Sequence, residues 1–159
     1  MGQYFVGINQ DKRQWIHPHR FGDGLKFLEF SGSASAFLAG LALLLRQSDS
    51  VGGGDWTSLS SASDRFPIVG SWAGDNVSIV GDYDESQLYM KAMDNYRDVS
   101  FEVLKAMAKD HYTRESLRAG LKWRMEPGCK EMCSDPEEEA LYRDVFKGPT
   151  FQEEANSGN

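Results

Sequence analysis

The stretch SGSASAFLAGLALLLRQ, residues 31–47, carries apolar side chains on nearly every side of the helix that its composition favours. A helix of this kind is stable only when its neighbours cover most of its surface. The apolar run also falls well short of the roughly 20 residues that span a bilayer. The serines that can form its N-cap are Ser31 and Ser33. We therefore predict a central core helix over residues 34–46, with Leu41 and Leu44 buried.

Ahead of this helix, apolar and polar residues alternate as they do in a half-buried strand. The segment YFVGI places Tyr4, Val6 and Ile8 on one face, the turn residues NQDK follow, and RQWI extends again. This pattern predicts that the chain opens with a β-hairpin. The segment HPHRFGDG is predicted to be a loop because of its proline and glycines. The Phe-rich segment LKFLEF, residues 25–30, is interpreted as a strand.

Two more strands are predicted beyond a long Gly- and Ser-rich loop at residues 48–65. They are FPIVGSW, residues 66–72, and NVSIVGDY, residues 76–83, and the short connection AGD between them predicts a second hairpin. The Gly-Asp pair recurs at several predicted boundaries, which favours turn chemistry. Asp75 is therefore interpreted as a turn residue whose replacement by Asn would be nearly neutral.

The second half of the chain is predicted to be helical. SQLYMKAMDNY, SFEVLKAMAKDHY and TRESLRAGLKWRM have helical apolar spacing, with His111 at a helix end and a cap at Thr113. A last helix is predicted to start at Asp135 as N-cap, followed by Pro136 at the first helical position and Glu138 three residues after the cap. The cationic stripe that is interpreted as a solvated face consists of Arg114, Arg118 and Lys122.

Strands followed by helices predict an α+β domain with an antiparallel sheet, built mainly from the N-terminal half and packed against the buried helix and the C-terminal helices. We expect a single domain over residues 1–148 and a polar, flexible tail over residues 149–159. The length of 159 residues suits one core.

The charge distribution excludes one class of function. The net charge is −7, and residues 126–159 hold nine acids against three bases. Non-specific binding to nucleic acid needs clustered Lys and Arg, so it is not expected. An acidic tail can instead dock on a basic partner. The chain shows no signal peptide or membrane span and has two cysteines, which indicates a cytoplasmic protein.

A divalent-metal site is the alternative suggested by the polar residues. Imidazole and carboxylate together bind zinc, manganese or iron, and the candidates for such a set are His17, His19, Asp82 and Asp84, with Asp23 and Asp75 as further acids. The pair Cys129 and Cys133 supplies at most half of a zinc site. No cofactor is expected on the favoured interpretation, although a divalent metal is possible.

Four short segments within about residues 1–112 form a distinctive combination: the start MGQY, the segment HPHRFGDGLK, and the motifs WAGD and GDYD. Together they resemble a family of small microbial and phage-associated proteins of unassigned activity. The resemblance implies one folded unit and no particular activity.

Two function classes remain. The favoured one is a non-enzymatic binding or inhibitory accessory protein, of the kind that phages and mobile elements carry, acting on a protein partner. Its contact residues would be the acidic tail and the tryptophans Trp15, Trp56 and Trp123. The alternative is a small metal-dependent hydrolase or nucleotide-binding protein that uses the histidines and aspartates above.

Overall fold

The computed structural model describes residues 2–32, 34–47, 66–109, 111–122 and 135–147. Within them the strands form one four-stranded sheet, and the fold is α+β as predicted. The elements in chain order are β1 (Phe5–Asn9), β2 (Gln14–Ile16), the 3-10 helix η1 (Pro18–Phe21), α1 (Phe27–Phe30), α2 (Ala36–Leu45), β3 (Val77–Gly81), α4 (Leu88–Asn95), β4 (Arg97–Asp98), α5 (Ser100–Met107), α6 (His111–Leu121) and α7 (Pro136–Lys147).

The sheet has the strand order β3-β1-β2-β4. Strand β1 is antiparallel to both β2 and β3, whereas the short β4 runs parallel to β2. The predicted N-terminal hairpin is therefore confirmed, with Gly7 opposite Ile16. No helix among the described residues has the length and apolar character needed to cross a membrane.

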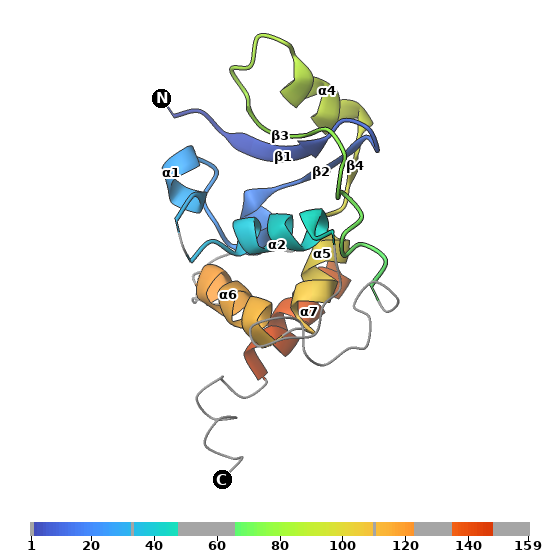
Figure 1. The fold of residues 1–159 in the computed structure, drawn as a ribbon. Coiled ribbons are helices and arrows are strands. Elements are labelled where there is room, and N and C mark those ends of the chain that lie inside the picture. The colour runs from blue at the N-terminus through green and yellow to red at the C-terminus, as the bar shows by residue number, and fades with distance from the viewer. Residues whose placement is uncertain (1, 33, 48–65, 110, 123–134, 148–159) are drawn as a thin grey trace.

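The two faces of the sheet carry different helices. Val6, Ile8 and Val80 pack on one face with Ala92 of α4. Phe5 and Ile16 belong to the other face, which meets the main core around α2. Figure 1 shows α4 on one side of the sheet, α1 and α2 on the other, and α5, α6 and α7 beyond α2. Alternation along each strand explains this division, since neighbouring side chains point to opposite faces.

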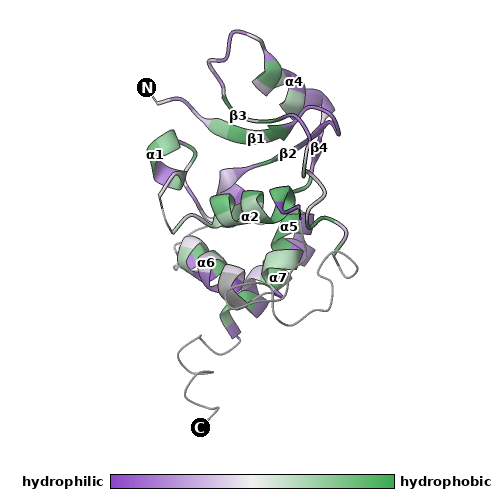
Figure 2. Ribbon diagram, viewed as in Figure 1, coloured by the Kyte–Doolittle hydropathy of each residue, from purple (hydrophilic) through white to green (hydrophobic). Residues whose placement is uncertain are grey.

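Helix α2 lies at the centre, as predicted, and packs against η1, α5 and α6. Figure 2 shows that it is hydrophobic along its length. Its N-cap is Ser35, whose Oγ accepts a hydrogen bond from Leu38 N at 3.0 Å, so the predicted cap at Ser31 or Ser33 is wrong. Leu44 is fully buried, but Leu41 is only partly buried, which corrects the expectation for that residue.

Residues 25–30 were expected to form a strand, and this prediction is wrong. Phe27–Phe30 is the short helix α1. Glu29 caps the N-terminus of α1. Its carboxylate accepts a hydrogen bond from Lys26 N at 3.1 Å, and its backbone N–H donates to the Lys26 carbonyl at 2.8 Å. Phe27 and Phe30 both stack edge-on against Phe5, at 5.6 and 6.1 Å between ring centroids. Aromatic packing at helical spacing therefore overrides the strand propensity of the Phe residues.

The predicted hairpin between residues 66–72 and 76–83 is also wrong. Residues 67–75 form consecutive turns, and β3 pairs with β1 instead. The backbone N–H of Gly70 donates to Leu43 O at 2.8 Å, and that of Trp72 donates to Leu44 O at 2.9 Å. The last carbonyls of a helix lack partners within it. The turns thus supply donors to the C-terminus of α2, and Gly70 provides the positive φ that they need.

Helices occupy the second half of the chain, as predicted, and Asp135 caps α7 through its Oδ1, which accepts from Glu137 N at 2.9 Å. His111 begins α6, however, and does not end the preceding helix, while Thr113 lies inside α6. The expectation of a solvated cationic stripe fails at Arg118, which is buried. Its Nε donates to Val145 O at 2.6 Å, and so it fastens the last turn of α7 to α6.

The backbones of η1 and α6 approach each other through two glycines. Gly22 ends η1 with φ 86°, and a Cβ there would lie 2.1 Å from Gly120 O. A Cβ at Gly120 would lie 2.5 Å from Phe21 O. Neither position has room for a side chain.

Candidate functional site

The predicted metal ligands do not come together. His17 and His19 flank Pro18 at the start of η1, with their ring centroids 6.0 Å apart. Asp82 and Asp84 follow β3, and β1 lies between β3 and the strand that leads to the histidines. Among the described residues no group of three or more His, Cys, Asp or Glu is placed to hold a metal ion. Cys129 and Cys133 lie outside these residues.

Asp82 and Asp84 both have structural partners. Asp82 Oδ1 accepts from Tyr4 N at 3.0 Å and ties the chain ahead of β1 to the end of β3. Asp84 accepts from the Ser86 hydroxyl and from Leu88 N, at 3.2 Å for the latter, at the start of α4. The Ser86 hydrogen bond holds the pKa of Asp84 below its ordinary value. The two carboxylates therefore organise loops.

Asp75 acts between segments and not within its own turn. Its carboxylate accepts from Asn9 Nδ2 at 2.8 Å and pairs with Lys12. These two donors lower the pKa of Asp75, with Lys12 the larger cause. Asp75 was predicted to be a turn residue or a further metal ligand, and its carboxylate instead links the turn to the β1–β2 hairpin.

Asp23, the remaining acid proposed as a ligand, supports the start of α2. Its Oδ2 accepts from Ser35 Oγ at 2.9 Å and from Phe37 N at 2.7 Å. Burial raises the pKa of Asp23, and these hydrogen bonds oppose the shift. Both hydrogen bonds favour the ionised carboxylate at a helix N-terminus.

Of the three tryptophans predicted as contact residues, the structure describes only Trp15, and this one is not placed as predicted. Trp15 is 9 % exposed and packs in the core between the sheet and α4, so it is not available as a surface contact. Trp56 and Trp123 lie outside the described residues. Trp72, for which no specific role was predicted, is buried and donates from Nε1 to Gln14 Oε1 at 2.7 Å.

An ionic cluster with a buried carboxylate joins the last helix to η1. Glu138 of α7 is 1 % exposed, pairs with Arg20 and accepts from the Tyr142 hydroxyl. The Tyr142 hydroxyl oxygen also lies 3.0 Å from Arg20 O, so its single proton is shared between the two acceptors. The capping pattern around Asp135 suggested a local role for Glu138, but its partners here are long-range. The cluster's donors and acceptors satisfy one another, which indicates that it holds α7 in place.

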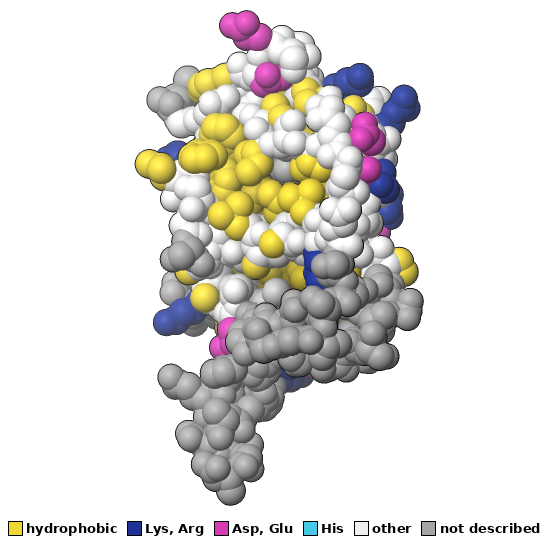
Figure 3. Space-filling model, viewed as in Figure 1, with side chains coloured by type: hydrophobic (Ala, Val, Ile, Leu, Met, Phe, Trp, Pro, Cys, Tyr) yellow, Lys and Arg dark blue, Asp and Glu magenta, His cyan; other side chains and the backbone are white. Residues whose placement is uncertain are grey.

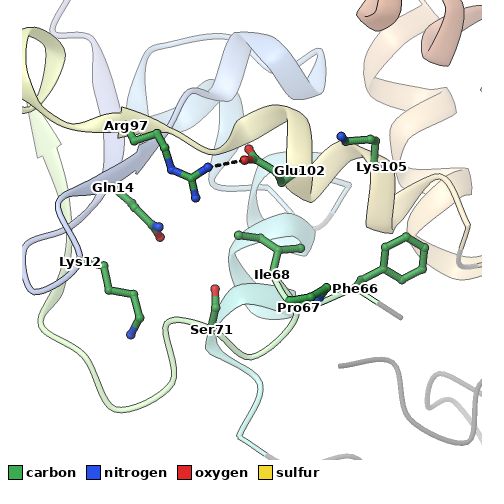
Figure 4. Close-up of a pocket in the computed structure, with 9 residues that line it drawn as sticks. All are labelled: Lys12, Gln14, Phe66, Pro67, Ile68, Ser71, Arg97, Glu102 and Lys105. Carbon is green, nitrogen blue, oxygen red and sulfur yellow. Dashed lines mark hydrogen bonds and ion pairs between the residues drawn. The ribbon is translucent and has the colours of Figure 1, made fainter. Parts of the chain in front are cut away.

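A cavity of about 530 Å³ lies between the β1–β2 hairpin, the turns that follow residue 65 and helix α5. Figure 4 shows the side chains of Arg97, Gln14 and Ser71 pointing toward one another across it, with Lys12 and Lys105 on opposite sides. The full lining is Lys12, Gln14, Phe66, Pro67, Ile68, Ser71, Arg97, Glu102 and Lys105. Two of the three cations in the lining are paired with carboxylates, Lys12 with Asp75 and Arg97 with Glu102, the latter at 2.6 Å.

A second surface is apolar. Figure 3 shows hydrophobic side chains gathered over α1, α2 and the neighbouring strands. The apolar face, as we call it, is defined by the exposed residues Phe27, Leu28, Leu45 and Ile79 and by the partly buried Phe5 and Leu41. Leu28 is 86 % exposed. Contiguous apolar surface of this kind marks interaction sites in soluble proteins.

Sequence reasoning overlooked both surfaces. The residues of the cavity come from three separate parts of the chain, and no local spacing joins them. The apolar face did leave a signal, because α2 is apolar on more sides than its neighbours cover. That excess was assigned to the core.

Comparison of the chain with protein-family models, with curated proteins and with solved structures found no match. The resemblance to small phage-associated proteins therefore stays a prediction.

Proposed function

We propose that this protein is a non-enzymatic binding or inhibitory accessory protein that engages a protein partner through the apolar face. The observation that supports this most strongly is the exposure of four large hydrophobic side chains, Phe27, Leu28, Leu45 and Ile79. These side chains come from α1, α2 and β3, the part of the molecule over which Figure 3 shows hydrophobic side chains gathered.

The composition of the face suits protein recognition. Its aromatic and aliphatic side chains resemble the apolar centre of protein interfaces, where charged residues are depleted. Phe27 is held by edge-on contacts with Phe5 and Phe30, at 5.6 Å between centroids in each case. A side chain held in this way loses little conformational entropy on binding.

The edge position of β3 adds a second means of attachment. Strand β3 is at one end of the sheet order, and its only partner in the described sheet is β1. Edge strands present unpaired backbone groups to an added chain. We propose that the protein acts in the cytoplasm in this way, and the proposed binding needs no cofactor.

A site-specific crosslinking experiment tests the proposal. A photoreactive phenylalanine analogue is placed at Leu28 or Leu45 in the full chain and irradiated in cells of the source organism. The matched control position is Lys91, which is exposed on α4, on the other side of the sheet. We expect one protein to be captured from both positions on the apolar face and not from Lys91.

The outcomes are distinct. Capture of the same proteins from all three positions would contradict the proposal, and so would capture of none. A crosslinked product containing only this chain would replace the protein partner by a second copy. Ile79→Asp should abolish capture from Leu45 if β3 belongs to the contact.

A further inference from the structure

The cavity between the β1–β2 hairpin and α5 is rich in hydrogen-bond donors. Arg97 and Lys105 are donors only, and Gln14 presents a donor for a structural reason. Because Trp72 Nε1 can only donate, the Gln14 atom that it contacts at 2.7 Å is the carbonyl oxygen. The Gln14 amide NH₂ is thereby the group available to a ligand.

Ser71 adds a hydroxyl to this set. Its Oγ is buried and has no hydrogen-bond partner among the described residues. In Figure 4 the hydroxyl points toward Gln14 and Arg97. A buried polar group without a partner costs free energy, and an acceptor on a ligand would remove that cost.

The side chains around the cavity carry a net charge of one positive unit, which one negative charge on a ligand would balance. Lys12, Arg97 and Lys105 are cationic. Asp75 pairs with Lys12, and Glu102 pairs with Arg97 at 2.6 Å. Three cations less two carboxylates leave one positive charge. Lys105 carries it: its Nζ lies 4.6 Å from the centroid of the Phe101 ring, and no carboxylate among the described residues pairs with it.

The remaining wall is apolar. Phe66, Pro67 and Ile68 form a continuous stretch of the lining. The volume of about 530 Å³ lies within the range of small-molecule sites, roughly 300–1,000 Å³. The cavity therefore combines an apolar wall with converging donors and one unbalanced cation.

We propose that this cavity binds a monocarboxylate joined to an apolar group, with the carboxylate between Arg97, Gln14 and Ser71 and the apolar group against Phe66, Pro67 and Ile68. A phosphate monoester carries about 1.5 to 2 negative charges at neutral pH, more than the one unbalanced cation here, and it would face the Glu102 carboxylate. The carboxylate can belong to a free organic acid or to an acidic residue beside an aromatic one in a peptide. This site is independent of the apolar face.

The probe is 3-phenylpropionate, titrated into the full chain and followed by amide chemical shifts. Its matched control is the uncharged 3-phenylpropanamide, which has the same apolar body. We expect saturable shifts at Ser71, Arg97 and Lys105, and about tenfold weaker binding of the amide, since a hydrogen bond to a charged group contributes about 1.5 kcal/mol or more. Higher salt should weaken only the carboxylate's binding.

Variants sharpen the test. Lys105→Gln should weaken binding of 3-phenylpropionate several-fold, whereas Glu102→Gln should strengthen it, because that change removes a repelling charge and releases Arg97. Lys91→Gln, on α4, is the control that should leave binding unchanged. All three side chains are at least partly exposed, so the fold should persist.

An acetylated and amidated peptide Gly-Phe-Glu-Gly, in a parallel titration, separates the two sources of the carboxylate. Tighter binding of the peptide would identify a protein segment as the ligand, and tighter binding of the free acid would identify a small molecule. Equal binding of acid and amide would overturn the proposal. Shifts located away from the cavity, or weaker binding by Glu102→Gln, would overturn it as well.

Discussion

The inner and outer sides of helix α2 use the same kind of residue in different ways. Leu44 is fully buried, whereas the next residue, Leu45, is 40 % exposed. The inner side meets η1, α5 and α6, while the outer side, with α1, contributes to the apolar face. An apolar residue therefore becomes part of the core only where the fold supplies a neighbour to cover it.

The largest expected effect is on the inner side. Leu44→Asp would bury a charge without a partner, which costs several kcal/mol and should unfold a domain of ordinary stability. Leu45→Asp, one residue later, should keep the fold. Far-UV circular dichroism and thermal melting compare them. Equal melting temperatures for the two variants would remove the distinction between the sides of α2.

A smaller loss of stability is expected at the ion pair between Arg20 and Glu138. Arg20→Met leaves the Glu138 carboxylate buried without its cation, which should lower the free energy of unfolding by about 2 kcal/mol. The double variant Arg20→Met, Glu138→Gln should regain part of the loss, because it leaves no bare charge. Urea denaturation measures both. If the single and double variants are equally stable, the cluster does not hold α7.

The stability that Asp23 contributes at the start of α2 is expected to depend on pH. Burial raises the pKa of Asp23 above its ordinary value of 3.8, so the folded chain binds the proton more tightly than the unfolded chain does. The contribution of Asp23 to stability therefore falls as pH rises through the folded-state pKa. The stability of Asp23→Asn relative to the parent should therefore increase as the pH rises above the ordinary carboxyl pKa of 3.8, and it should level off above the folded-state pKa of Asp23. Denaturation curves at several pH values test this, and a constant difference would contradict it.

The smallest effect on stability is expected on the outer side. Leu28→Asp changes a side chain that solvent already surrounds, so the melting temperature should stay within about a degree of the parent, as is usual for surface changes. A large fall would show that α1 needs Leu28 for folding and that the apolar face is part of the core.

Features with local signals were predictable from the sequence. The alternation of Val6 and Ile8 indicated a strand, and Asp135 with Pro136 indicated a helix start, because each pattern depends on residues a few positions apart. The class α+β followed from the order of such elements. Residues 66–75 could not be predicted, since their turns exist to supply donors to the end of α2.

The candidate sites were harder to predict for the same reason. Arg118 and Glu138 look solvent-exposed in their own helices, and only their partners in other elements make them buried. The histidines and aspartates attracted attention because of their chemistry, yet the sheet order separates them. The cavity residues Arg97 and Gln14 have no local pattern in common.

The glycine contact between η1 and α6 affects how mutational maps of this protein should be interpreted. In a saturation scan, Gly22 and Gly120 should tolerate no substitution, not even alanine, because each faces backbone atoms, which a change of side-chain rotamer cannot move away. A second substitution elsewhere cannot create the missing space. Functional variants should therefore keep glycine at both positions. A loss of function on substitution there would reflect the close approach of two backbones and would not identify a ligand-binding or partner-binding residue. When a saturation scan is used to map the cavity and the apolar face, Gly22 and Gly120 should be excluded from the set of candidate binding residues.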